Sequence, residues 1–399
     1  GEDGKFAESP AKATGNNVFK AAPSVDDWFE TAKLNYGVDM QAPDQPKHFD
    51  PIPSTWTKMR DILLFWAGKG VDGFRCDVAE MVPVEFWEWA IKSVKEKYPE
   101  TVFIAEIYTP SMYKDYVTKG GFDYLYDKVG LYDKVRPLME GKPDAKVAGI
   151  LEALQQSEGI DGKMLRFLEN HDEQRIASKT FAGDARAGVP GMAVTTLLGT
   201  GPVLIYNGQE SGEKGEGAEG FGGEDGRTTI FDYWGVPAHQ AWAGNGKFDG
   251  AGLDEVQKEL RAFYTKLLNL ANSEQAFVDG ERMILPTTEA GVFAFVRYND
   301  SSAFVVAANF NQQDHWVNLE IPEEIFKKAH LTQFTSDFTS ATGYLYEWSA
   351  PKAEPVDSIG KPAHGAVGDS KVVVPDKEGI GLVSKVMLHR WNAYVFELF

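Results

Sequence analysis

Apolar residues between positions 54 and 272 alternate between a helical spacing and short, nearly continuous runs. The first helix is predicted over residues 54–70, with Ser54 or Thr55 as its cap and an apolar stripe of Met59, Ile62, Leu63, Phe65 and Trp66. Further helices are predicted over 84–98, before 156, around 184–199 and over 253–272. Five short apolar runs between these helices predict strands at 71–78, 101–108, 122–126, 164–168 and 202–206. Helices that separate short buried strands indicate βαβ units and a parallel sheet.

After position 273 the pattern changes to short strands separated by turn residues. These strands are predicted at 291–298, 303–309, 316–320, 371–374 and 393–398. Such a series is typical of an antiparallel all-β sandwich. Residues 1–53, in contrast, are loop-like, and they lack the basic stretch followed by an apolar stretch that marks a signal peptide. We therefore predict three parts: residues 1–53, 54–272 and 273–399.

Composition removes several classes of function. Lysine and arginine number 40 against 59 acidic residues, a formal net charge of −19, so the chain should repel the phosphates of nucleic acid. The single Cys76 excludes an intrachain disulfide, and no cluster of Cys and His has zinc spacing. No apolar run reaches about 18 residues, so no membrane span is predicted. The localisation stays open, because this composition suits bacterial cytoplasm and periplasm or secretion equally.

Candidate chemistry lies at the ends of the predicted strands. The first strand ends in Asp77, the second in Glu106, and the fourth in Glu169-Asn170-His171-Asp172. A single acid at such a place is most often a helix cap or a solvated strand end. Three together favour a site, because active sites of parallel barrels lie at the C-terminal ends of the strands. Arg75 and Asp77 are two residues apart and should share one face of an extended strand.

Paired carboxylates of this kind suit glycoside cleavage. One acid protonates the leaving oxygen, and in the retaining mechanism a second carboxylate about 5 Å away attacks the anomeric carbon. No Ser-His-Asp spacing or nucleophile elbow is present, and the glycine-rich stretches lack the residues of a P-loop.

One glycine-rich stretch stands apart. Residues 208–226 contain eight glycines and six acidic residues. This composition predicts a mobile, solvated loop, with a rim loop over a ligand site or a cation-binding loop as alternatives.

Three ordered segments resemble signature regions of the α-amylase family of glycoside hydrolases. They are Val71-Asp72-Gly73-Phe74-Arg75-Cys76-Asp77, Ile104-Ala105-Glu106 and Glu169-Asn170-His171-Asp172. The terminal sandwich resembles the C-terminal domain of the same family. Lys33-Leu34-Asn35 resembles a loop motif of its neopullulanase and maltogenic amylase-like subgroup, which accepts α-1,4 and α-1,6 bonds. The resemblance implies an α/β fold, the (β/α)8 TIM-type barrel, here with only about its last five βα units.

The same resemblance implies roles for individual residues. Asp77 would be the nucleophile and Glu106 the general acid and then base, while Asp172 and His171 would bind hydroxyls of the distorted sugar. Arg75 would keep Asp77 ionised and oriented. Glu106, between Ala105 and Ile107, would have the more apolar setting of an acid. Tyr108 and Arg175 are further candidates for substrate contacts.

The chain also departs from the family pattern. The family's first signature, Asp-x-x-x-x-Asn-His, is absent, and five βα strands are predicted where a closed barrel has eight. Residues 1–53 then resemble the remnant of a domain inserted after the third barrel strand. The 399-residue chain alone is expected to be weakly active or inactive, and to self-associate through exposed sheet edges. No cofactor is certain, and calcium is in doubt, because Met81 stands where the family's calcium site uses a histidine carbonyl.

Three functions are therefore compared. The favoured function is a retaining α-glucan hydrolase that acts on starch-type polysaccharides and malto-oligosaccharides. An α-glucanotransferase with the same residues is the first alternative, because transfer differs only in how well water is excluded. A non-catalytic amylase-like binding protein is the second, and the presence of all three acids argues against it.

Overall fold

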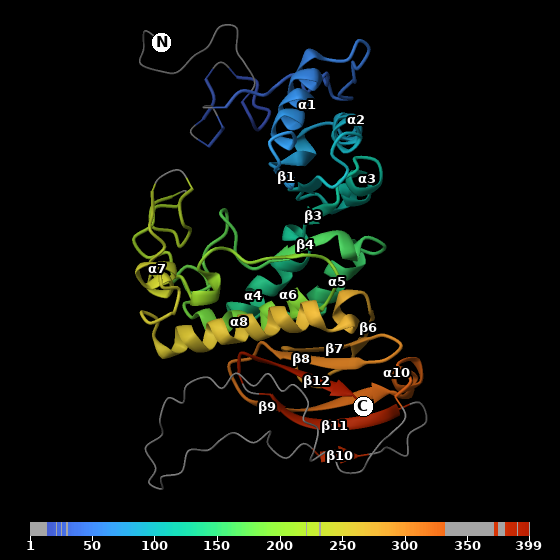
Figure 1. The fold of residues 1–399 in the computed structure, drawn as a ribbon, viewed down its shortest axis with the longest axis vertical. Coiled ribbons are helices and arrows are strands. Elements are labelled where there is room, and N and C mark those ends of the chain that lie inside the picture. The colour runs from blue at the N-terminus through green and yellow to red at the C-terminus, as the bar shows by residue number, and fades with distance from the viewer. Residues whose placement is uncertain are drawn as a thin grey trace. The chain divides into compact units, whose positions relative to one another are not determined.

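The computed structural model describes residues 14–331 except 21, 25, 29, 30, 221, 231 and 232, together with 371–373, 380–388 and 390–398. The chain divides into two units, Gly1–Tyr126 and Asp127–Phe399 (Figure 1). This boundary falls inside the predicted barrel region, and the sandwich belongs to the second unit. The three-part division at residues 53 and 272 stays a prediction. Within the part of the chain that the structure describes, no helix has the length and apolar content to cross a bilayer.

Three parallel strands form the sheet of the first unit. They are β1 (Gly73–Cys76), β2 (Val102–Ala105) and β3 (Tyr124–Tyr126), paired in chain order. The helices of this unit are α1 (Ser54–Ala67), α2 (Val84–Lys95) and α3 (Tyr113–Thr118). Strands paired in chain order with helices between them are the βαβ pattern that the sequence predicted.

Aromatic packing holds the helices of the first unit. The rings of Trp56 on α1 and Phe86 on α2 lie 5.6 Å apart, and those of Trp87 and Phe122 lie 5.0 Å apart. Trp56 also donates its indole N–H to the carbonyl of Tyr36 at 3.0 Å. A buried indole thus supplies apolar contact and fixes the preceding loop at the same time.

The apolar stripe of α1 does not face the described core. Ile62, Phe65 and Trp66 are about half exposed, and the buried residues of the helix are Trp56 and Ala67. The predicted helix is confirmed, and its apolar stripe is largely exposed within the part of the chain that the structure describes. Amphipathic spacing reports that a helix has an apolar side, and it does not report which neighbour covers that side.

The second unit carries two more parallel strands, β4 (Met164–Phe167) and β5 (Val203–Leu204), with Arg166 opposite Val203. Its helices are α4 (Asp133–Met139), α5 (Ala148–Gln156), α6 (Gly188–Leu197), α7 (Pro237–Ala243), α8 (Glu255–Ser273) and α9 (Gln275–Val278). Every residue of α6 is buried, as expected for a helix that is apolar on all sides. With these strands, the five predicted parallel strands of a partial barrel are confirmed.

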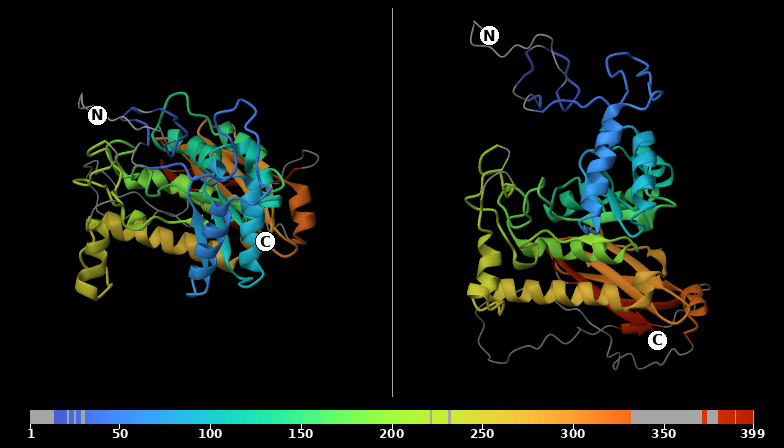
Figure 2. Two further views of the ribbon diagram at one scale, coloured as in Figure 1. Left: turned by 90° about the horizontal axis from the view of Figure 1, so that it is seen from above. Right: turned by 45° about the horizontal axis from the view of Figure 1, so that its top comes forward.

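Antiparallel strands then form two sheets. One has the order β12 (Asn392–Leu398), β8 (Ala303–Asn309), β7 (Val292–Tyr298) and β6 (Glu281–Leu285), and the other has β10 (Lys371–Val373), β11 (Ile380–Leu388) and β9 (His315–Pro322). A short helix, α10 (Glu323–Lys328), follows β9. The predicted all-β region is confirmed, although β6 and β11 were not predicted. Within the second unit, α6 and α8 lie between the strands β4 and β5 and the sandwich (Figure 2).

Buried arginines join the parts of the second unit. Arg166 on β4 pairs with Asp127 at 3.0 Å and with Asp161 at 2.5 Å, and Asp161 in turn pairs with Arg282 of β6 at 3.0 Å. Arg297 on β7 is 1% exposed. Its guanidinium donates to five backbone carbonyls, those of Leu197, Gly199, Phe277, Gly280 and Glu281. One buried cation thus satisfies the ends of α6 and α9 together with the start of β6.

We predict that Arg297→Met destabilises the second unit by about 3 kcal/mol or more, because several buried carbonyls lose their donors at once. Urea unfolding followed by fluorescence measures this change. The control is Lys327→Met, which removes an exposed pair with Glu323 and should cost no more than about 0.5 kcal/mol. Equal midpoints for the two variants would contradict the role given to Arg297.

Candidate active site

Arg75 and Asp77 form the ion pair that their spacing predicted. Arg75 lies on β1, and Asp77 follows the last residue of that strand. The guanidinium Nη1 donates to Asp77 Oδ1. The Asp77 side chain is 76% exposed, whereas that of Arg75 is 25% exposed. The strand therefore presents an open carboxylate on a half-buried cation.

Glu106 follows the end of β2 and lies on the other side of the same guanidinium. Its Oε1 is 3.0 Å from Arg75 Nη2 and accepts the hydroxyl of Tyr108 at 2.6 Å. Its Oε2 accepts the N–H of Val78 at 2.7 Å. Ala105 and Ile107 are fully buried, as the sequence suggested, but the carboxyl group itself has three polar partners. The apolar setting expected for Glu106 is therefore wrong at the atoms that matter.

Tyr126, at the end of β3, completes this cluster. Its hydroxyl accepts from Arg75 Nε at 3.3 Å, and its ring lies 5.2 Å from the guanidinium carbon. Partial burial disfavours the charge on Arg75, but Tyr126, Glu106 and Asp77 outweigh it and raise the pKa of the arginine. Sequence reasoning missed Tyr126, although its position at a third strand end was a usable signal.

The turn after β1 is strained. Val78 has φ 38°, a left-handed conformation that a β-branched residue rarely adopts and that costs roughly 1–3 kcal/mol. This conformation places its N–H on Glu106. The next N–H, that of Ala79, donates to the Glu106 carbonyl at 2.9 Å. The strained turn thus locks the residue after Asp77 onto Glu106.

A pocket of about 870 Å³ lies beside this turn within the first unit. Lys33, Leu34 and Asn35, the predicted loop motif, line it together with Glu80 and Met81. Glu80, which sequence reasoning also missed, accepts the N–H groups of Tyr108 and Thr109 at 3.1 and 2.9 Å. It therefore ties the loop after β1 to the loop after β2.

The surroundings of Met81 do not fit a calcium ion. The ammonium of Lys33 donates to the Met81 carbonyl at 3.0 Å, which places a positive charge on the oxygen that the family pattern gives to the metal. Burial lowers the pKa of Lys33. Among the described residues there is no group of three or more His, Cys, Asp and Glu that could hold a metal ion. We derive no step through a metal.

The second unit carries His171 and Asp172 after β4. The Asp172 N–H donates to the side chain of Asn170 at 2.9 Å, and Asp172 Oδ2 lies 3.2 Å from His171 Nε2. Both side chains are partly exposed, at 29% and 24%. The two residues form a neighbouring pair, with the carboxylate reachable from solvent.

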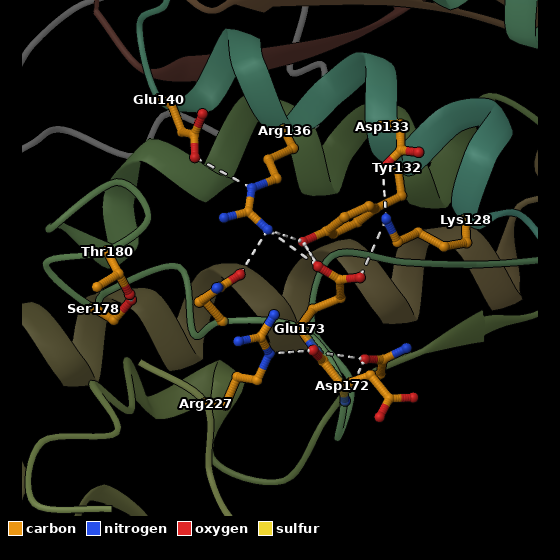
Figure 3. A network of polar contacts seen from close by, with 12 residues as sticks. Lys128, Tyr132, Asp133, Arg136, Glu140, Asp172, Glu173, Ser178, Thr180 and Arg227 are labelled. Carbon is orange, nitrogen blue, oxygen red and sulfur yellow. Dashed lines mark hydrogen bonds and ion pairs between the residues drawn. The ribbon is translucent and has the colours of Figure 1, made fainter. Parts of the chain in front are cut away.

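Glu173 binds this loop to helix α4 and the turn before it. It accepts from the Tyr132 hydroxyl at 2.8 Å and from Arg136 Nη1 at 3.1 Å, and it pairs with Lys128 at 3.2 Å (Figure 3). Glu173 was not among the residues predicted from the sequence. Its position directly after Asp172 was the only available signal.

Arg175 is fully buried. Its Nη1 pairs with Glu169 at 2.9 Å, and its guanidinium carbon lies 4.0 Å from the centre of the Tyr206 ring. Burial raises the pKa of Glu169 even though Arg175 opposes that shift. The described contacts of Arg175 are internal to the protein, so a substrate contact at this residue stays a prediction.

The structure thus brings Arg75, Asp77, Glu106 and Tyr108 together in the first unit. It brings His171 and Asp172 together in the second. The meeting of the two sets in one pocket stays a prediction.

Residues 208–226 are not a solvated loop throughout: Gln209, Ser211, Glu213 and Ala218 are buried. That part of the prediction was wrong.

Cys76 reports on the closure of the strand end between Arg75 and Asp77. Burial raises the pKa of its thiol to about 12, and the Arg75 guanidinium only partly opposes this shift. Since the thiolate is the reactive form, alkylation by iodoacetamide at pH 9 should be slower in the folded protein than in urea by roughly 100-fold or more. Mass spectrometry follows the labelling. Equal rates in the folded and unfolded chain would mean that this strand end is open.

Comparison with known proteins supports one family throughout. The model of the α-amylase catalytic domain matches residues 6–230. Alpha-amylase 3 of Dictyoglomus thermophilum is 25% identical over 327 residues, which are 74% of this chain and 59% of that protein. An α-1,4-glucan:maltose-1-phosphate maltosyltransferase of Chlorobaculum tepidum is 37% identical over 95 residues, 21% of this chain and 14% of that protein. The aligned regions therefore span less than two thirds of either relative.

Solved structures agree on the fold. An α-amylase from H. orenii superposes with a TM-score of 0.58 at 18% identity, covering 92% of this chain and 73% of the other. A maltogenic α-amylase from Thermotoga neapolitana gives a TM-score of 0.54 at 19% identity, covering 92% and 71%. Because the family model matches more than half of the residues, the chain belongs to the α-amylase family.

Proposed function

We propose that the protein is a retaining α-glucan hydrolase that cleaves α-1,4 bonds of starch-type glucans. The resemblance of Lys33-Leu34-Asn35 to the neopullulanase motif suggests α-1,6 bonds as a second substrate class. The observation that carries the proposal is the shared guanidinium of Arg75, which pairs with Asp77 on one side and Glu106 on the other. Two carboxyl groups held at adjacent strand ends are the equipment of the retaining mechanism.

In the proposed first step, Asp77 Oδ attacks the anomeric carbon while Glu106 gives its proton to the leaving oxygen. The bond to the leaving sugar breaks, and an ester to Asp77 forms. Glu106 then takes a proton from water, and the resulting hydroxide displaces Asp77. Exposure of Asp77 suits a nucleophile that must reach a sugar, and its contact with Arg75 holds the carboxylate in place.

Tyr108 and the Val78 N–H are proposed to orient Glu106 for both steps, because each binds a different oxygen of its carboxyl group. Asp172 and His171 are proposed to bind hydroxyls of the distorted sugar. Their partial exposure and mutual contact support this role. Hydrogen bonds that strengthen as the sugar distorts would lower the barrier rather than improve ground-state binding.

A transglycosylase is the second candidate. The observation that favours it is the 37% identity to a segment of a maltosyltransferase. A sugar hydroxyl would then replace water in the second step, and the same residues would serve. A non-catalytic binding protein is not favoured, since both carboxylates of the first unit keep the contacts that catalysis needs.

Two substitutions separate the roles of the Asp77 and Glu106 carboxylates. Asp77→Asn should lower turnover of both maltoheptaose and α-maltosyl fluoride by about 10³-fold or more, because both need the nucleophile. Glu106→Gln should lower turnover of maltoheptaose by about 10²–10⁴-fold but slow the first burst of fluoride release far less, because fluoride leaves in the first step without a proton from the enzyme. Both are measured with concentrated purified protein and compared with the unsubstituted chain, whose own activity is expected to be weak: steady-state rates give turnover, and the pre-steady-state burst gives the first fluoride release.

Asp61→Asn is the control, because it changes an exposed carboxylate of the same unit that pairs with its neighbour Arg60. It should keep full activity. Unchanged turnover in Asp77→Asn, or a fluoride burst slowed in Glu106→Gln as much as maltoheptaose turnover, would contradict the assigned roles.

A further prediction concerns the molecule that accepts the glycosyl group from Asp77. Chromatography of the products from maltoheptaose should show only shorter sugars, because water is the proposed acceptor. Products longer than maltoheptaose would favour the transglycosylase.

A further inference from the structure

The segment 208–228, rich in glycine and acidic residues, packs against the loop that carries Asp172. Glu213 is 3% exposed, and its two oxygens accept the N–H groups of Gly215 and Ala238, both at 2.9 Å. Thr228, at the far end of the segment, is 4% exposed. Buried groups thus hold the segment at Glu213 and at Thr228 despite its glycines.

Its last residues run beside residues 172–180. The carbonyl of Gly226 accepts the N–H of Arg175 at 2.8 Å, and the carbonyl of Asp225 accepts the Thr180 hydroxyl at 2.7 Å. Arg175 Nη2 donates to the Thr228 hydroxyl at 3.1 Å. These contacts come from residues 225, 226 and 228 of the segment, so the two stretches are aligned over several positions.

Glycine is required at position 226 for this approach. Gly226 has φ +84°, and a Cβ there would lie 2.1 Å from Thr180 Oγ1 and 2.5 Å from Ser178 Oγ. A side chain would therefore both strain the backbone and push the two stretches apart. The glycine content of the segment serves close contact at this point rather than mobility.

Arg227 makes the contact nearest to the proposed chemistry. Its Nε donates to the backbone carbonyl of Asp172 at 2.6 Å (Figure 3). Its Nη1 pairs with Asp225 at 2.6 Å. Asp225 also accepts the Arg227 N–H at 3.0 Å, so the arginine is oriented by its own turn. The contact to Asp172 uses the backbone and leaves the carboxylate beside His171.

We propose that Arg227 is a positioning residue that holds Asp172 for the distorted sugar. This inference rests on the function proposed above for Asp172. The Asn170 side chain holds the Asp172 N–H and the Glu173 N–H, and the Glu173 carboxylate is fixed by Tyr132 and Arg136. Arg227 is the contact to the carbonyl side of the same residue. Together they fix the backbone from both sides, which sets the direction of the carboxylate.

The test compares Arg227→Met with Arg186→Met. Arg186 is a close match, since it also pairs with an aspartate two residues earlier, Asp184, at nearly the same exposure of 22% against 24%. Arg227→Met should lower kcat on maltoheptaose about 10-fold or more with KM changed less than about 3-fold, because the lost interaction acts in the transition state. Arg186→Met should leave both unchanged. Arg227→Lys, which keeps the charge and one donor, should recover part of the loss.

A double variant shows whether Arg227 acts through Asp172. If it does, Asp172→Asn with Arg227→Met loses no more activity than Asp172→Asn alone. Additive losses would overturn the inference. Asp225→Asn replaces Arg227→Met in this test if Arg227→Met does not fold. It keeps the arginine but removes the carboxylate partner of Nη1, and a kcat loss of about 3-fold is expected.

The outcomes separate the two proposals. Full activity in Asp172→Asn would contradict both the proposed role of Asp172 and this inference. Loss in Asp172→Asn, together with identical kcat in Arg227→Met and Arg186→Met, would overturn the inference alone.

Discussion

The guanidinium of Arg75 is the interaction on which the candidate site of the first unit depends. It contacts the carboxylates of Asp77 and Glu106 and the hydroxyl of Tyr126. These partners come from the ends of three successive strands, so one cation fixes the spacing between strand ends as well as the orientation of both acids. Without that charge, two carboxylates so placed would repel each other, and Glu106 would be left buried without a cation.

The second unit solves a related problem with a different contact. The Asp172 carboxylate lies beside His171, and its backbone is held by Asn170 and Arg227. This difference has a chemical consequence. An ion pair such as that of Arg75 favours the charged form of a nucleophile, whereas backbone contacts leave a carboxylate available to accept sugar hydroxyls. Elsewhere in the second unit, the buried Arg166 and Arg297 hold strands and helix ends in place.

Much of the fold was predictable because it depends on local periodicity. The five parallel strands and the main helices are present, since short apolar runs between amphipathic helices have few other solutions. The strand β6 was missed because Glu281 and Arg282 begin it with charges. Those charges are used in tertiary contacts, such as the pair of Arg282 with Asp161, which no local pattern reveals.

The site was predictable as far as its residues sit at strand ends in recognisable motifs. The pair of Arg75 and Asp77 followed from a two-residue spacing. The polar surroundings of Glu106 did not, because its partners Val78 and Tyr108 reach it only through the strained turn and the loop after β2. Arg227 lies 55 positions from Asp172, and its contact is made across a segment whose composition suggested mobility. Composition counts glycines, but it cannot show that one of them permits close packing.

The proposed mechanism requires that the carboxylates of Asp77, Glu106 and Asp172 act on one sugar. A crystal structure of the protein with bound acarbose, whose unsaturated ring imitates a distorted sugar, tests it most directly. All three carboxylates should then lie within hydrogen-bonding distance of that ring or of its linking nitrogen. Acarbose bound beside Asp77 and Glu106 with Asp172 on a separate surface would contradict it.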